Sequence, residues 1–177
     1  MEKNTKIYIP AFLSHLKVLP NGYPLPFFVA IVDGKPDFRL LDAKKQALCC
    51  TSKICGICGK KLFKGAYYFI SGPEGYANRI ASDPPMHRQC AEYSLEACPH
   101  LHLQKAHRRE NGIERLKEQQ MEHIADKPAT ILLVKADKCE LIPHPSSSTL
   151  RLIKFRPSSY ETYAYDNGIL EKVYLST

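Results

Sequence analysis

The chain lacks any long run of apolar residues. No stretch of its 177 residues approaches the ~18 that a membrane-spanning helix requires. Its first ten residues, MEKNTKIYIP, also lack the basic-then-apolar layout of a secretory signal. These absences predict a cytoplasmic protein with no membrane partner. An apolar fraction of 44% and a charged fraction of 24% are ordinary for a soluble globular protein, so we expect a hydrophobic core.

Several motifs of enzymes are absent as well. No glycine-rich phosphate loop is present, and SSSTLRL (146–152) lacks the helix and lysine that a P-loop needs. Serine, histidine and aspartate are scattered without the local context of a catalytic triad. The sequence therefore disfavours nucleotide chemistry and triad hydrolysis.

Acidic residues are missing between Asp42 and Glu74. The net charge is +7, and the acid-free interval contains six lysines: Lys44, Lys45, Lys53, Lys60, Lys61 and Lys64. A stretch of one sign can attract the phosphates of nucleic acid or an acidic protein surface. The alternative is a solvated basic face without a partner.

Seven cysteines are present, at positions 49, 50, 55, 58, 90, 98 and 139. An odd number without a signal sequence argues against a disulfide framework and for reduced thiols. Clustered cysteines in a reducing compartment bind metal or stay buried as small apolar groups. We expect Cys49 and Cys139 to be core or surface thiols and Cys98 to be buried at a helix end.

The segment CGICGKK (55–61) could be a redox pair or half of a metal site. A redox CGxC opens a helix directly after a strand, where the thiol pKa falls. Here Gly59 and two lysines lead instead toward a predicted hairpin. The C-x-x-C spacing of Cys55 and Cys58, followed by a glycine that permits a tight turn, favours a zinc knuckle.

His87 and Cys90 supply the matching second pair. Their spacing of three puts both side chains on one face of a helical turn, and a helix N-terminus stabilises a thiolate. The order of knuckle, hairpin, loop and helix with H-x-x-C is the layout of a treble-clef zinc finger. The sequence therefore predicts one structural Zn²⁺ held by Cys55, Cys58, His87 and Cys90. Cys50 could replace Cys55 only if the knuckle had another register.

Local patterns predict the surrounding elements. Residues 27–41 read as a hairpin turning at Asp33-Gly34, and Asp42 as the N-cap of a short helix over 42–50. Short apolar runs at 62–63 and 67–70 suggest a small hairpin, and GPEGYANRIA (72–81) suggests a loop.

Further along, Ser82 or Asp83 could cap a helix whose first positions are Pro84 and Pro85, with Pro99 ending it. Residues 100–126 are charged and helix-prone. ILLVKA (131–136), KCELIP (138–143) and TLRLIKF (149–155) read as strands. Ser158 and Glu161 form a capping box, which predicts a last helix over 158–165.

These elements predict an α+β fold, a small mixed sheet and helices built around a central treble-clef zinc finger. We divide it into an extended arm and hairpin (1–48), a zinc-binding module (49–103), and a C-terminal helix, strands and helix on the same core (104–177).

The assembled motifs resemble a family of small, largely uncharacterised zinc-finger proteins of bacteria and bacteriophages. The matching stretches are GYPLPFFVAIVDGKPDFRLLD, CGICGKKL, FISGP, NRIASDPPMHRQCAEYSLEACP and ILLVKA, of which S-D-P-P-x-H-x-x-C-A-x-Y is the most specific. The resemblance implies the same four zinc ligands. It implies no activity.

Three classes of function remain open. A non-enzymatic accessory protein could bind nucleic acid through Lys60, Lys61, Lys64, Arg79 and Arg88, with Tyr67, Tyr68 and Tyr76 stacking on unpaired bases or forming the module's small core. A protein of this kind could instead bind a host protein through its proline-rich arm or the charged segment 103–123. A metal-dependent nuclease is disfavoured, because four protein ligands leave zinc no open position and no catalytic histidines accompany the site.

Overall fold

A computed structural model of the chain describes residues 7–104 and 127–174. The strands are β1 (Val29–Val32), β2 (Lys35–Leu41), β3 (Tyr67–Ser71), β4 (Ile80–Ala81), β5 (Thr130–His144), β6 (Ser147–Asp166) and β7 (Ile169–Lys172). The helices are α1 (Ala43–Ser52), α2 (Pro73–Asn78), α3 (Arg88–Ala97) and α4 (Pro99–His102), and a 3-10 turn covers Ala11–Leu13. The fold is a mixed α+β arrangement, as predicted.

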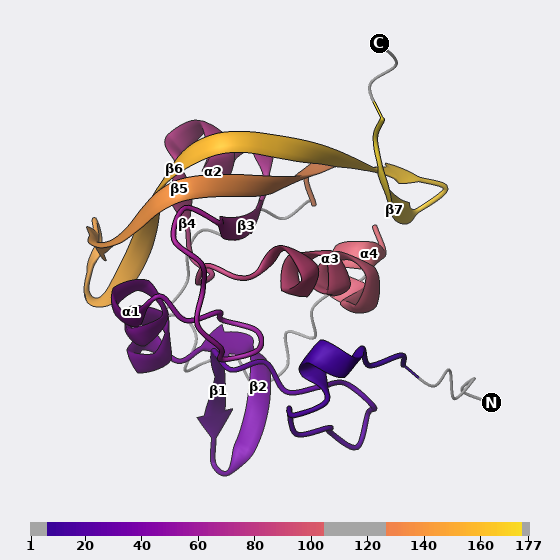
Figure 1. The fold of residues 1–177 in the computed structure, drawn as a ribbon, viewed down its shortest axis with the longest axis horizontal. Helices are drawn as coiled ribbons and strands as arrows, with labels where there is room; N and C mark the ends of the chain where they lie inside the picture. Colours follow the sequence, from indigo (N-terminus) through magenta and orange to yellow (C-terminus); the bar gives the residue numbers. More distant parts are fainter. Residues whose placement is uncertain (1–6, 105–126, 175–177) are drawn as a thin grey trace.

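A long antiparallel hairpin of β5 and β6 organises the larger sheet. The strand order is β3-β5-β6-β4, and β7 also pairs with β6. In Figure 1 the two long strands arch across the molecule, with α2 on one side and α1 and α3 on the other. Residues 131–134, the apolar run ILLV, are all buried, because both faces of β5 are covered. Among the described residues, no helix has the length and apolar character needed to cross a membrane.

Two local predictions near the N-terminus are confirmed. β1 and β2 form an antiparallel hairpin whose turn residues Asp33 and Gly34 both have positive φ, at 49° and 76°. Those angles are typical of the tight turns that join hairpin strands. The side chain of Asp42 accepts hydrogen bonds from the amides of Lys44 and Lys45 and so caps α1.

The predicted last helix over 158–165 is wrong, because this segment belongs to strand β6. Residues 159–164 pair with β5 in continuous register, for example Thr162 with Leu132 and Tyr160 with Val134. The apolar β5 needs hydrogen-bonding neighbours on both edges, and a run rich in tyrosine and threonine suits a strand. The tertiary pairing overrides the local capping signal. The predicted strands 131–136 and 138–143 likewise form one strand, β5, with a bulge near Asp137.

The helix predicted from Pro84 begins later, at Arg88, with His87 as its N-cap. Pro84 precedes another proline, and a residue before proline is driven toward extended backbone. The Pro84-Pro85 pair accordingly lies outside the helix, and Met86 forms an isolated bridge with Tyr68. After Cys98 the chain makes the short helix α4, which Pro99 opens.

The hairpin predicted over 62–70 is also wrong. β3 pairs with β5 instead, and the knuckle is closed by a bridge between Ile54 and Lys61. The predicted loop at 72–81 contains α2 and β4. Most of the charged segment 103–123 lies outside the described residues.

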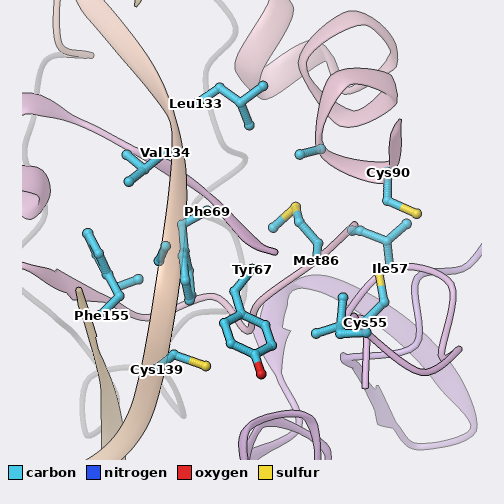
Figure 2. Close-up of a cluster of buried hydrophobic side chains, with 14 of the residues drawn as sticks. Cys55, Ile57, Tyr67, Phe69, Met86, Cys90, Leu133, Val134, Cys139 and Phe155 are labelled. Atoms are coloured by element: carbon cyan, nitrogen blue, oxygen red, sulfur yellow. The ribbon is translucent and has the colours of Figure 1, made fainter. Parts of the chain in front are cut away.

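One core connects the sheet to the cysteine site. Phe69 of β3 and Phe155 of β6 stack with ring centroids 5.0 Å apart, although β5 lies between these two strands in the sheet. Figure 2 shows Met86 between these sheet residues and the two cysteines Cys55 and Cys90, with Ile57 beside the cysteines. All of these side chains are buried in the same cluster, so the sheet and the site fold as connected parts.

The buried polar side chain of Gln46 ties three segments together. It is 1% exposed, and its Nε2 donates to the carbonyl of Ser82 at 2.6 Å and to that of Arg151 at 3.3 Å. These bonds join α1 to β6 and to the connection between β4 and α3, which contains Ser82.

We therefore expect Gln46→Met to lower the free energy of unfolding by about 1–3 kcal/mol, because it removes a buried side-chain donor from two part-buried hydrogen bonds. Urea unfolding measures the change. Lys44→Met, at an exposed site of the same helix, is the matched control and should be nearly neutral. Equal stability of the two variants would contradict a role for Gln46.

Candidate metal centre

Four side chains from two distant segments meet at one point. Each of Cys55, Cys58, His87 and Cys90 offers a ligand atom, and these atoms all lie within 4.8 Å of one another. Ligands bound tetrahedrally to one Zn²⁺ at their usual bond lengths lie about 3.3–3.8 Å apart. Among the described residues, this is the one cluster of three or more His, Cys, Asp or Glu with metal-binding geometry. The predicted ligand set is thus brought together, and it can hold one metal ion.

The first pair lies on a tight knuckle that follows α1. The amide of Cys55 donates to the carbonyl of Lys60 at 2.8 Å, and the amide of Gly59 donates to the carbonyl of Cys55 at 2.9 Å. Gly59 has φ +70°, a conformation that a side chain would strain. Backbone amides also point at the sulfurs: that of His87 lies 3.4 Å from Cys55 Sγ.

The second pair is positioned by Pro84 and Pro85. The carbonyl of Pro85 accepts the amide of Gly56 at 2.9 Å, which joins the knuckle to the chain just before α3. Pro84 packs so closely that a Cβ on Gly56 would lie 2.4 Å from its Cγ. Met86 then bridges to Tyr68 on β3. These contacts place the next residue, His87, beside the knuckle.

The hydrogen bonds of His87 select its ligand nitrogen. Its Nε2 lies 2.9 Å from the carbonyl oxygen of Lys61. A carbonyl only accepts, so Nε2 carries the proton and donates. Nδ1 is then the free acceptor, and it lies 3.3 Å from Cys58 Sγ. Metal-bound histidines are typically oriented by such a bond from the other ring nitrogen.

The three thiols share one buried environment. Cys55 and Cys90 are 0% exposed and Cys58 is 5% exposed. Hydrogen bonds from Cys55 and Cys90 lower the pKa of the Cys58 thiol, whereas contacts with Cys55 and Cys58 raise the pKa of Cys90. The cluster by itself favours a single thiolate, because three adjacent negative charges repel one another. A divalent cation removes that repulsion, so the donor set fits a thiophilic metal.

The N-terminal arm supports the knuckle from outside. His15 Nε2 donates to the carbonyl of Cys58 at 2.8 Å. The amides of Phe27 and Phe28 donate to the carbonyls of Ile57 and Gly56 at 2.9 and 3.0 Å. Nothing in the local sequence pattern predicted these bonds, because they join residues roughly 30 to 40 positions apart.

The five predicted basic residues differ in their positions and in their partners. Lys60, Lys61 and Lys64 are exposed around the knuckle, and Lys61 Nζ donates to the carbonyl of Ser52 at 2.7 Å. Arg79 is exposed at the end of α2. Arg88 instead forms ion pairs with Glu92 and Glu161, at 2.8 and 2.6 Å.

The aromatic side chain nearest the site was not identified from the sequence. Phe63 is 75% exposed, and its ring contacts that of His87 edge-on, with centroids 6.2 Å apart. Tyr67, predicted as a possible stacking residue, is only 5% exposed and belongs to the core. Tyr76 packs against Tyr160. An aromatic residue directly before Lys64 and two positions after Lys60-Lys61 was the signal for Phe63.

Comparison of the chain with protein-family models, with curated proteins and with solved structures finds no match. The interpretation of the site therefore depends on its own residues and their geometry.

The close packing at Gly56 yields a test of how the two ligand pairs are held together. Gly56→Ala should force Pro84 outward and lower stability in the presence of Zn²⁺ by about 1–3 kcal/mol, as overpacked cores do. Gly72→Ala is the control, because its Cβ would meet Pro128 at an ordinary 3.5 Å. Urea unfolding compares the two. A Gly56→Ala protein as stable as the control would contradict this packing.

Proposed function

We propose that the four-ligand site binds one structural Zn²⁺. Three sulfurs and one imidazole nitrogen form a donor set typical of structural zinc sites. All four donors come from the protein, and three of the four side chains are buried. Zinc held this way lacks an open position for an activated water, so the site supports folding rather than metal-assisted hydrolysis.

We also propose a treble-clef arrangement for the module. Its knuckle carries one ligand pair, and the N-terminus of α3 carries the other. The end strand of the sheet, β3, joins the module through the bridge between Tyr68 and Met86. The resemblance to zinc-finger proteins of bacteria and bacteriophages rests on the motif residues alone and remains a proposal.

The biochemical role that the geometry favours is binding of single-stranded nucleic acid. The exposed Phe63 carries this proposal, because it stands among Lys60, Lys61 and Lys64 on the rim of the metal site. We call these four residues the knuckle surface. Proteins that bind single strands combine cationic side chains with an aromatic ring on which a base stacks.

The charges of the knuckle surface are available to a ligand. Within the described residues, Lys60, Lys61 and Lys64 form no ion pair with a carboxylate. Arg88 differs, because two glutamates neutralise it. The proposed contacts are therefore narrower than the five basic residues that the sequence suggested. Arg79 lies on α2, outside the knuckle surface.

Loss of one ligand should remove the metal and unfold at least the central module. We expect Cys58→Ser and His87→Ala to purify without stoichiometric zinc and to lose cooperative unfolding, because structural zinc binding is coupled to folding. Metal analysis and thermal melting measure both effects. Cys98→Ser, outside the ligand set, should retain one zinc per chain. Freshly purified, reduced natural protein without stoichiometric zinc would contradict the proposal.

The knuckle surface should bind a labelled 20-nucleotide single strand in a salt-dependent manner. Contacts from three lysines predict a slope of log K against log salt of about −2. Phe63→Ala should weaken binding by about tenfold, since a stacked base contributes roughly 1–3 kcal/mol. Fluorescence anisotropy with thymidine and uridine oligomers measures both.

Two matched variants serve as controls for this binding. Tyr174→Ala removes an aromatic ring that is 80% exposed after β7, and Lys35→Gln removes an exposed lysine from β2. Both should bind as the natural chain does. Absence of any binding at low salt would overturn the nucleic-acid proposal and would move a protein partner ahead.

A further inference from the structure

A second cysteine site lies apart from the metal centre, between α1 and β5. The side chains of Cys50 and Cys139 meet there, and each shifts the pKa of the other. Both side chains are buried, at 2% and 7% exposure. Figure 2 shows Cys139 beside Tyr67, on the other side of the core from Cys55 and Cys90. The pair brings together sulfurs that are 89 positions apart in the sequence.

A lysine completes this site. Lys53 Nζ lies 3.9 Å from Cys139 Sγ and donates to the carbonyl of Cys139 at 3.2 Å. It also lies over the Tyr67 ring, 5.4 Å from the centroid. Lys53 ends α1 with φ 53°, a left-handed conformation in which a side chain is strained.

The ammonium of Lys53 has no carboxylate partner within the described residues. A half-buried cation is stabilised by a nearby anion, and the nearest group that can become one is the Cys139 thiol. The hydrogen bond from Cys50, followed by the charge of Lys53, lowers the pKa of Cys139. The ammonium of Lys53 contacts the sulfur of Cys139, which makes Cys139 the thiol of the pair that a positive charge favours as thiolate.

We propose that Cys50 and Cys139 form a peroxide-sensitive dithiol, in which Cys139 is the nucleophile and Cys50 the resolving thiol. This site is independent of the nucleic-acid role proposed above. The arrangement shares two features with redox-active cysteines: a lysine lies beside one thiol, and a second thiol lies next to it.

The chemistry has two steps. The Cys139 thiolate attacks one oxygen of hydrogen peroxide, the O–O bond breaks, and the released hydroxide takes a proton to become water; Cys139 is now a sulfenic acid. The sulfur of Cys50 then attacks the sulfenic sulfur, the S–O bond breaks, and the departing hydroxide combines with the Cys50 proton as a second water. Two thiols and one peroxide thus give one disulfide and two waters, and a dithiol reductant restores the pair.

Burial decides which oxidant can act. Sulfurs of side chains 2% and 7% exposed are closed to a bulky disulfide such as oxidised glutathione, whereas peroxide is close to water in size. Cys49 is next in sequence but is not the reactive thiol, since burial and then the charge of Cys55 raise its pKa to about 12. Cys98 is half-buried and lies beyond α3, away from this pair.

The test is peptide mapping without reduction, after brief treatment of the zinc-loaded protein with a few equivalents of hydrogen peroxide. We expect a Cys50–Cys139 disulfide with zinc retained and with Cys98 still a thiol. Oxidised glutathione at the same concentration should produce no such link. Loss of zinc with oxidation of its ligand cysteines, while Cys50 and Cys139 remain thiols, would overturn the proposal.

Single variants assign the roles of the two sulfurs. Cys50→Ser should let a sulfenic acid accumulate on Cys139, where a dimedone probe traps it. Cys139→Ser should leave Cys50 unlabelled. Cys49→Ala should form the disulfide as the natural chain does, which separates the two neighbouring cysteines. Labelling of Cys50 in Cys139→Ser would contradict the assigned nucleophile.

The role of Lys53 is tested by rate. Lys53→Met should slow disulfide formation by about tenfold, equivalent to one pKa unit of the attacking thiol. Lys53→Arg keeps the charge and should restore most of the rate. Zinc content and thermal melting confirm that both variants are folded. Equal rates for the Met and Arg variants would remove Lys53 from the mechanism.

Discussion

Three buried sulfurs and one imidazole converge on a single point, and much of the structure depends on keeping them there. The cluster draws the knuckle after α1 and the start of α3 together across about 30 residues. Neighbouring thiolates repel one another, so the arrangement is stable only with a cation or with protons in place. A metal ion bound at this cluster would therefore hold the knuckle against the start of α3.

Backbone packing prepares this convergence. Pro84 and Pro85 lie outside α3 because consecutive prolines disfavour helix, and Gly56 has no side chain to keep Pro84 away. The imidazole of His87 is turned by the carbonyl of Lys61. The same ring supports the exposed Phe63, so the metal site and the proposed nucleic-acid contact share one scaffold.

The ligand set could be predicted from the sequence because it depends on short spacings: C-x-x-C on a turn and H-x-x-C at a helix start. The turn at Asp33-Gly34 and the cap at Asp42 were predicted for the same reason. Residues 158–165 were mispredicted as helix because their conformation is decided by pairing with β5, about 30 positions earlier. The hydrogen bond from His15 to the carbonyl of Cys58 and the contact between Cys50 and Cys139 are likewise long-range, and no local pattern predicts them.

X-ray absorption at the zinc edge of the purified, reduced protein tests the four-ligand centre most directly. Our account predicts three sulfur neighbours at about 2.3 Å and one nitrogen at about 2.0 Å, with no oxygen in the coordination shell. A shell that contains a water oxygen, or fewer than three sulfurs, would contradict a closed structural site formed by Cys55, Cys58, His87 and Cys90.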